Sequence, residues 1–255
     1  MDPQQSTGPL TGHRAVVVGG SRGIGRAIVT RLAADGARVV FGYASNQPAA
    51  AEVEAAVKEA GGEAVGVRAE LADLADVAGL FLAADRHFGG PGLDILVNSA
   101  GIPRNTPIGE TEEDAYDRVM AVNAKGPFFA MQHAARRMAT GGRIVNVSTV
   151  TTRWPRVPES VYAASKAALE QFTRIGSREL GPRGITVNTV SPGPTDTEML
   201  RGATTDEIRA AVAAETPLGR LGRTGDIAAV VAFLVGPDAG WVTGQNILAD
   251  GGLVY

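Results

Sequence analysis

Short apolar runs rich in β-branched residues alternate with longer Ala-rich stretches from residue 14 almost to the end of the chain. This alternation is typical of successive β-α-β units, in which helices cover both faces of a buried parallel sheet. The predicted strands are, in chain order, 15–18, 37–41, 64–67, 93–98, 143–147, 185–190 and 245–248. The pattern therefore predicts an α/β fold with one doubly wound parallel sheet of about seven strands.

Glycines mark the expected boundaries between these elements. Gly36 precedes the second strand, a helix over 49–60 ends at Gly61-Gly62, and a turn at Gly141-Gly142 precedes the fifth strand. No change of composition marks a second domain, and a hydrophobic fraction of 44% in 255 residues is enough for one large core. We therefore expect a polar tail over residues 1–12 and one domain over residues 13–255.

The segment between Pro192 and Asp226 departs from this rhythm. It contains Pro194, a polar stretch, a short Ala-rich helix over 205–215, and then Pro217. An insertion at the carboxyl end of a strand is well placed to cover a ligand. Residues 195–217 are therefore predicted to form a substrate-covering insertion.

Composition excludes several classes of site. The chain has no Cys, and its three His are scattered, so disulfides, thiolate chemistry, a metal site and a Ser/His/Asp set are not expected. A formal charge of −3 with interspersed signs gives no basic stripe for nucleic acid. No apolar run approaches the roughly 20 residues of a membrane span, and the polar start has no signal-peptide pattern, so we expect a cytoplasmic protein.

A glycine-rich stretch, Val18-Gly-Gly-Ser-Arg-Gly-Ile-Gly25, follows the first predicted strand and opens an amphipathic segment. The order predicts strand, tight turn and helix. Gly19, Gly23 and Gly25 lack a Cβ, so a phosphate can approach the free N–H groups at the start of the helix. The stretch therefore favours binding of a pyrophosphate.

Tyr162 and Lys166 are four residues apart, which places a phenol and an ammonium on one face of a predicted helix. Tyr has an ordinary pKa of about 10, so it becomes a useful acid/base near neutral pH when a neighbouring cation stabilises its anion. We expect Lys166 to lower the pKa of Tyr162 in this way.

Together these two motifs resemble the short-chain dehydrogenase/reductase family, from about residue 13 to residue 255. Five further stretches match in order: Asn98-Ser99-Ala100-Gly101, Asn123 within 122–126, the strand Arg143 to Val150, the turn Ser191 to Thr197, and Asp250-Gly251-Gly252. The resemblance implies a Rossmann-like fold and hydride transfer between a nicotinamide and a carbonyl or secondary alcohol carbon.

The same resemblance assigns catalytic roles. It implies that Tyr162 is the acid/base, that Lys166 lowers the pKa of Tyr162 and binds the nicotinamide ribose, and that Asn123 holds a water in a proton relay. Asn123 has a second interpretation, as a residue at a helix kink. The catalytic hydroxyl lies thirteen residues before Tyr in the family, which selects Thr149, with Ser148 as the alternative. Only one of two adjacent strand residues can face the cofactor.

Two other positions depart from the family pattern. Val18 replaces the Thr that usually braces the glycine turn, and Glu70 replaces an Asp that usually contacts adenine. The cofactor-binding residues implied by the resemblance are Gly19, Ser21, Arg22, Gly23, Ile24, Gly25, Tyr43, Ala44, Ser45, Asn46, Glu70, Leu71, Asn98, Ala100, Gly101, Tyr162, Lys166, Pro192, Gly193, Thr195 and Thr197.

The end of the second strand indicates which cofactor is bound. NAD enzymes place a carboxylate there to accept the ribose hydroxyls, but this chain has Tyr43. Arg22, Ser45 and Asn46 offer donors for a 2′-phosphate. NADP(H) is therefore favoured, as in the family's ketoreductases that act on 3-oxoacyl-carrier-protein or naphthols.

The expected substrate is a partly apolar carbonyl compound. Its predicted pocket combines Ile102, Pro103 and Arg104, the loop 151–157 with Trp154, and the insertion with Met199 and Leu200. Two alternatives stay open: an NAD-dependent alcohol dehydrogenase of the same family, and a non-catalytic NADP(H)-sensing regulator. The resemblance also implies a homotetramer.

Overall fold

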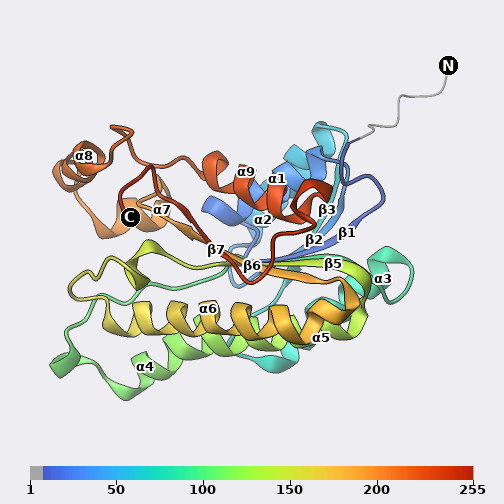
Figure 1. Ribbon diagram of the computed structural model, residues 1–255, viewed down its shortest axis with the longest axis horizontal. Helices are drawn as coiled ribbons and strands as arrows, with labels where there is room; N and C mark the ends of the chain where they lie inside the picture. The colour runs from blue at the N-terminus through green and yellow to red at the C-terminus, as the bar shows by residue number, and fades with distance from the viewer. Residues whose placement is uncertain (1–7, 255) are drawn as a thin grey trace.

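Among residues 8–254, which the computed structural model describes, seven strands form one sheet in the order β3-β2-β1-β4-β5-β6-β7 (Figure 1). Every neighbouring pair is parallel. The strands are β1 (Arg14–Val18), β2 (Arg38–Tyr43), β3 (Glu63–Arg68), β4 (Leu93–Asn98), β5 (Met138–Val147), β6 (Thr186–Pro192) and β7 (Asn246–Ala249). On one side of β1 lie β2 and β3, and on the other side lie β4 to β7 in chain order. The prediction of a doubly wound parallel sheet is therefore confirmed.

Helices cover both faces of this sheet. Figure 1 shows α1, α2 and α9 on one face, and α3, α5 and α6 on the other. The α-helices are α1 (Gly23–Ala34), α2 (Gln47–Glu59), α3 (Leu74–Phe88), α4 (Glu113–Met120), α5 (Gly126–Arg137), α6 (Ser160–Leu180), α7 (Glu198–Ala203), α8 (Asp206–Glu215) and α9 (Thr224–Val235). Short 3-10 or π segments are η1 (Ile108–Glu110), η2 (Ala121–Lys125), η3 (Val150–Thr152), η4 (Gly181–Arg183) and η5 (Pro237–Ala239).

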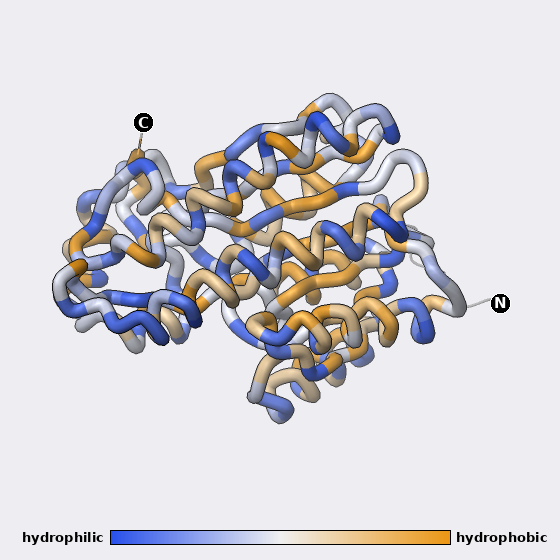
Figure 2. Tube along the Cα trace, turned by 90° about the horizontal axis from the view of Figure 1, so that it is seen from below, coloured by the Kyte–Doolittle hydropathy of each residue, from blue (hydrophilic) through white to orange (hydrophobic). Residues whose placement is uncertain are grey.

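The core consists of two apolar clusters, one on each face of the sheet. Successive strand residues face opposite sides, so Val17 of β1 packs in the cluster with Ile28 and Ile227, whereas Val16 packs in the cluster with Leu80. Figure 2 shows the same arrangement as apolar strands enclosed between helices with mixed surfaces. Burial of both faces explains why the strands appear in the sequence as continuous apolar runs rather than as alternating ones.

A buried polar chain crosses the second face between these apolar residues. Asn98 of β4 donates to Asn146 of β5 at 2.8 Å, and Asn146 donates to Thr173 of α6 at 2.8 Å. The Thr173 hydroxyl lies 2.7 Å from that of Thr189 in β6. Because buried polar groups are costly unless they are bonded, this chain ties three central strands and α6 in one arrangement.

Most predicted boundaries lie within two residues of the observed ones, and two differ by more. Strand β5 begins at Met138 rather than at residue 143, because Met138 pairs with Leu93 before a register irregularity that contains Gly141. The folded part already includes Leu10, which is 1% exposed and donates its N–H to the Asp35 carbonyl. Residues 1–7 of the predicted tail lie outside the described residues.

The insertion contains two helices where the sequence predicted one. Besides α8, the six-residue α7 forms here, and the Thr197 side chain caps it by accepting the Leu200 N–H at 3.2 Å. A six-residue helix is too short to show helical periodicity, which is why the sequence pattern did not reveal it.

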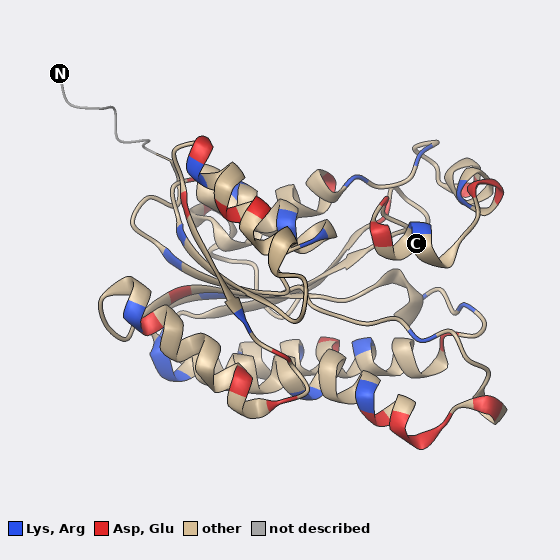
Figure 3. Cartoon of the chain, turned by 180° about the vertical axis from the view of Figure 1, so that it is seen from behind, with Lys and Arg blue, Asp and Glu red and all other residues tan. Residues whose placement is uncertain are grey.

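Charged residues of both signs are interspersed over the helices on the side that Figure 3 shows. Within the described residues, no helix is long and apolar enough to cross a membrane. The same part of the chain contains no group of three or more His, Asp or Glu side chains that could hold a metal ion.

Candidate active site

The glycine-rich turn joins β1 to α1 at the carboxyl edge of the sheet. Gly19 has a φ of +82°, and a Cβ there would lie 2.7 Å from Ala100. A Cβ on Gly25 would overlap the carbonyl oxygen of Gly19. Side chains at these two positions are therefore excluded, because they would collide with the loop after β4 and with the turn itself.

A cleft of about 490 Å³ opens beside this turn. Thirteen of the predicted cofactor residues line it: Gly19, Ser21, Arg22, Gly23, Ile24, Gly25, Tyr43, Ala44, Glu70, Leu71, Ala100, Gly101 and, from the insertion, Thr197. The turn, the ends of β2 and β4, and the insertion thus enclose one cleft, which extends along the edge where parallel strands bind ligands.

Other predicted cofactor residues lie off the walls of this cleft: Ser45, Asn46, Asn98, Tyr162, Lys166, Pro192, Gly193 and Thr195. The Asn46 side chain caps α2 by accepting the Ala49 N–H at 3.0 Å. Asn98 is 1% exposed and belongs to the buried polar chain, while Gly193 lines a separate cavity. The Asn98 side chain is therefore engaged in a bond between strands.

Two charged side chains at the cleft have partners that the sequence did not predict. Arg22 lies 3.9 Å from the carboxylate of Glu198 in α7, with both side chains exposed. Glu70 forms an ion pair with Arg118 of α4 at 2.9 Å. The insertion is therefore in contact with the glycine turn, and the carboxylate expected near adenine is shared with an arginine.

The amine of Lys166 is buried at the ends of β4 and β5. The side chain is 3% exposed, and Nζ donates to the carbonyl oxygens of Val147 at 2.9 Å and Ala100 at 3.4 Å. A Cβ on Gly101 would lie 3.0 Å from Nζ, which places the amine directly behind the wall of the cleft. Burial lowers the pKa of Lys166 from 10.5 to about 8.

The pKa of Tyr162 is shifted in the direction opposite to the predicted one. Burial raises the pKa of Tyr162 to about 12, a hydrogen bond with the Thr149 side chain lowers that pKa in part, and the charge of Glu159 raises it. The prediction that Lys166 lowers this pKa is therefore wrong for the protein without ligand. Desolvation outweighs the bonding that favours phenolate, so the phenol keeps its proton at neutral pH.

Ser148 and Thr149 face opposite sides, as strand alternation requires. The Thr149 side chain acts on the Tyr162 phenol and lowers its pKa in part, and the Thr149 hydroxyl accepts the hydroxyl of Thr151 at 3.1 Å. The Ser148 hydroxyl instead donates to the carboxylate of Glu170 at 2.8 Å. Of the two adjacent hydroxyls, the structure places that of Thr149 beside the phenol.

Asn123 lies in the π segment η2, where α4 passes into α5. Its side chain is fully buried, accepts the Ile102 N–H at 2.8 Å, and donates to the Ile102 carbonyl at 2.9 Å and to the Ser165 hydroxyl at 3.1 Å. A π segment widens the helix locally and is frequent at functional sites. The interpretation of Asn123 as a residue at a helix kink thus describes its backbone. Its side chain connects the loop after β4, at Ile102, with Ser165 of α6.

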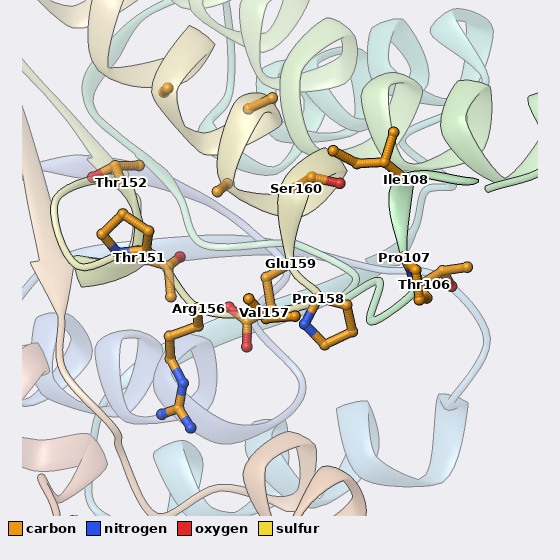
Figure 4. A pocket seen from close by; sticks show the side chains of 14 residues that line it. Thr106, Pro107, Ile108, Thr151, Thr152, Arg156, Val157, Pro158, Glu159 and Ser160 are labelled. Carbon is orange, nitrogen blue, oxygen red and sulfur yellow. The ribbon is translucent and has the colours of Figure 1, made fainter. Parts of the chain in front are cut away.

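The predicted substrate wall is divided between two cavities. Ile102, Pro103 and Met199 line the cofactor cleft. A second cavity of about 570 Å³ surrounds the start of α6 (Figure 4) and is lined by Thr106, Pro107, Ile108, Thr151, Thr152, Pro155, Arg156, Val157, Pro158, Glu159, Ser160, Ala163, Ala164 and Ala167. Arg104, Trp154 and Leu200 lie on neither wall, and the Arg156 guanidinium lies over the Trp154 ring.

Comparison with known proteins places this geometry in a family. The family model described as enoyl-(acyl carrier protein) reductase matches residues 18–254. A hydroxynaphthalene reductase-like protein from Metarhizium robertsii is 41% identical, and the match covers 96% of each chain. A short-chain dehydrogenase/reductase structure from Serratia marcescens is 45% identical with a TM-score of 0.90, over 96% of this chain and 99% of the other. This chain belongs to the short-chain dehydrogenase/reductase family.

One solved family member has NADP bound. The structure of an angucycline C-6 ketoreductase with bound NADP is 44% identical to this short-chain dehydrogenase/reductase, with a TM-score of 0.92 over 96% of this chain and 97% of that one. Agreement over nearly the whole of both chains means that no extra domain distinguishes the two folds.

Sequence reasoning missed two residues of this dehydrogenase/reductase site: Arg118 and Glu170. Arg118 comes from a helix with no family motif, and its contact with Glu70 depends on tertiary packing. Glu170 lies one helical turn beyond Lys166, but its contact with Ser148 likewise depends on tertiary packing.

The buried amine predicts how stability depends on pH. Between pH 8 and 10.5 the unfolded chain keeps the Lys166 proton and the folded chain releases it. The free energy of unfolding therefore rises with pH in this window, by up to about 3 kcal/mol from this residue. Lys166→Met has no amine to titrate, so it does not gain this contribution. The free energy of unfolding of Lys166→Met, measured relative to that of wild type, therefore falls by up to about 3 kcal/mol as the pH rises from 8 to 10.5.

Urea denaturation of both proteins at intervals from pH 7 to 10.5 measures this difference. Lys125→Met, at an exposed position of η2, is the matched control and has a stability difference that stays constant with pH. A constant difference for Lys166→Met would show that the amine titrates alike in the folded and unfolded chains.

Proposed function

We propose that this enzyme is an NADP(H)-dependent ketoreductase that interconverts a carbonyl compound and a secondary alcohol. The observation that carries the proposal is the arrangement of Thr149, Tyr162 and Lys166 beside a glycine-lined cleft. The NADP-bound ketoreductase that this chain resembles over its whole length supports the same reaction class.

The cleft fits a dinucleotide. Gly19 and Gly25 allow the turn to pack closely against Ala100 and against itself. Residues 21–25 line the cleft, so the start of α1 would face a pyrophosphate there. When bound, NADPH supplies the hydride that reduces the carbonyl carbon. Arg22 would bind the 2′-phosphate, because Tyr43 at the end of β2 offers no carboxylate to repel it.

Tyr162 would donate the proton to the carbonyl oxygen. A pKa of about 12 keeps the phenol protonated at neutral pH, which is the state required of an acid. The Thr149 hydroxyl accepts from Thr151, so its own hydrogen is free to be shared between Tyr162 and the substrate oxygen. We assign the positioning of that oxygen to Thr149 and not to Ser148.

Lys166 and Asn123 would return the proton to Tyr162 after each turnover. The lowered pKa of Lys166 allows Nζ to release and recover a proton near neutral pH. Asn123 fixes the loop at Ile102 and the α6 residue Ser165, and we propose that a water held at η2 connects Nζ to solvent.

The proposed substrate is a partly apolar carbonyl compound. The cavity at the start of α6 is lined mainly by Pro, Ala, Val and Ile side chains (Figure 4). The insertion 195–217 is proposed to cover the substrate, because Thr197 and Met199 already border the cofactor cleft.

The decisive experiment measures loss of NADPH absorbance with a panel of aliphatic, aromatic and polycyclic ketones. Turnover with at least one ketone is expected, and Tyr162→Phe is expected to lower kcat by about 10² to 10⁴, because it removes the proton donor. NADPH affinity should stay within about twofold of wild type. Tyr116→Phe, exposed on α4, is the control. Near-normal turnover by Tyr162→Phe would refute the assigned mechanism.

Cofactor preference follows from the charge at the 2′-phosphate. We expect NADPH to bind more than about tenfold more tightly than NADH, a difference above about 1.4 kcal/mol. Arg22→Ala should weaken NADPH binding by about the same factor and leave NADH binding nearly unchanged. Fluorescence titration checks both, and Arg31→Ala at the distant end of α1 is the control. Equal affinities for the two cofactors in wild type would contradict the assignment.

We further propose a cytoplasmic homotetramer. Large apolar side chains are exposed on two pairs of elements: Phe128 and Ile175 on α5 and α6, and Phe233 and Trp241 on and after α9. Such exposed side chains would be covered if these elements formed two distinct interfaces of a closed tetramer. Light scattering should give four times the 26.3 kDa of one chain, and a monomer mass at micromolar concentration would refute the assembly.

A further inference from the structure

We propose that Glu170 is a positioning residue of this site. Its buried carboxylate fixes the segment 148–152 against α6, so that the Thr149 hydroxyl points at Tyr162. The inference rests on the proposed function, in which these two side chains handle the carbonyl oxygen.

The carboxylate bonds to both sides of the Thr149 segment. Glu170 is 6% exposed and follows Lys166 by one turn of α6. One of its oxygens, Oε1, accepts the Ser148 hydroxyl at 2.8 Å and the Thr152 hydroxyl at 2.7 Å. One donor directly precedes Thr149 and the other follows it by three residues, so a single atom holds both ends of the segment.

Each hydroxyl has a more distant alternative acceptor. The Ser148 oxygen lies 3.4 Å from the Lys166 carbonyl, and the Thr152 oxygen lies 3.0 Å from the Thr149 carbonyl. In both cases the carboxylate is closer, and bonds to a charged acceptor are the stronger ones. Within residues 8–254, Glu170 has no ion pair with Lys or Arg. The two hydroxyls therefore supply the side-chain bonds that offset its burial.

The bonds around Thr149 determine where its hydroxyl hydrogen can point. Its hydroxyl oxygen accepts both the backbone N–H of Thr151 at 3.3 Å and the Thr151 hydroxyl at 3.1 Å, which leaves its hydrogen directed elsewhere. Tyr162 and Glu170 belong to the same helix, so the carboxylate sets the position of Thr149 relative to the phenol. The same bond occupies Ser148 and keeps its hydroxyl away from the phenol.

Two substitutions separate the acceptor from the rest of the side chain. Glu170→Gln keeps a carbonyl oxygen at the same place, so kcat should stay within about threefold of wild type. Glu170→Leu removes the acceptor and should lower kcat by about 10- to 100-fold. This loss is smaller than the loss caused by removing a transition-state hydrogen-bond donor itself, because the Thr149 hydroxyl is still present. NADPH affinity should stay within about twofold, because Glu170 does not line the cofactor cleft. Glu179→Leu, exposed on the same helix, is the matched control.

A double-mutant cycle with Thr149→Val tests whether Glu170 acts through Thr149. If it does, Glu170→Leu in the Thr149→Val background lowers kcat by less than about threefold, because the hydroxyl to be positioned is already gone. The same 10- to 100-fold loss in both backgrounds would overturn the proposal.

A crystal structure of Glu170→Leu supplies a readout independent of turnover. Compared with a crystal structure of wild type, the Thr149 hydroxyl should lie farther from the Tyr162 phenol, and an unchanged distance between these two oxygens would overturn the proposal. If wild type reduces no carbonyl compound, the proposed function fails while this structure still decides the role of Glu170. If Glu170→Leu fails to fold, the crystal structure of Thr152→Val is determined instead, because this variant removes one of the two donors to Glu170. An unchanged position of the Thr149 hydroxyl relative to the Tyr162 phenol would then overturn the proposal.

Discussion

The site depends on accommodating one buried cation at the carboxyl edge of the sheet. The amine of Lys166 is stabilised there by the carbonyl oxygens of Val147 and Ala100, which come from the end of β5 and the loop after β4. Both carbonyls reach the amine because β4 and β5 are in register at Asn98 and Asn146, whose side chains are bonded to each other. The polar chain in the core and the position of the amine are thus parts of one arrangement, in which moving either strand would leave a buried donor without an acceptor.

The same burial determines the state of the neighbouring phenol. Tyr162 lies in a poorly solvated position beside Glu159, and the hydrogen bond with Thr149 only partly offsets the cost of ionising it. In the proposed mechanism, the protonated phenol gives its proton to substrate, and the amine with a lowered pKa helps to recover a proton from solvent.

The sequence was sufficient for the fold and for most of the cleft. Buried strands are recognisable as continuous apolar runs, and Gly19 and Gly25 are required by close backbone contacts that no other residue allows. The pKa of Tyr162 was not predictable from its spacing to Lys166, because it depends on desolvation by segments far away in the chain. The role of Glu170 was equally hidden, since an acidic residue on a helix is usually solvated and only packing against β5 shows otherwise. Asn98 matched a family motif, yet its side chain serves the sheet rather than the cleft.

The central claim is that this site reduces a carbonyl carbon with hydride from NADPH while Tyr162 supplies the proton. Reduction of a ketone with NADPH deuterated at nicotinamide C4, followed by NMR of the alcohol, tests that claim most directly. The account predicts one deuterium at the carbinol carbon when the stereochemically correct label is used, and none at that carbon when unlabelled NADPH is used in D2O. An alcohol whose carbinol hydrogen comes from solvent would contradict it.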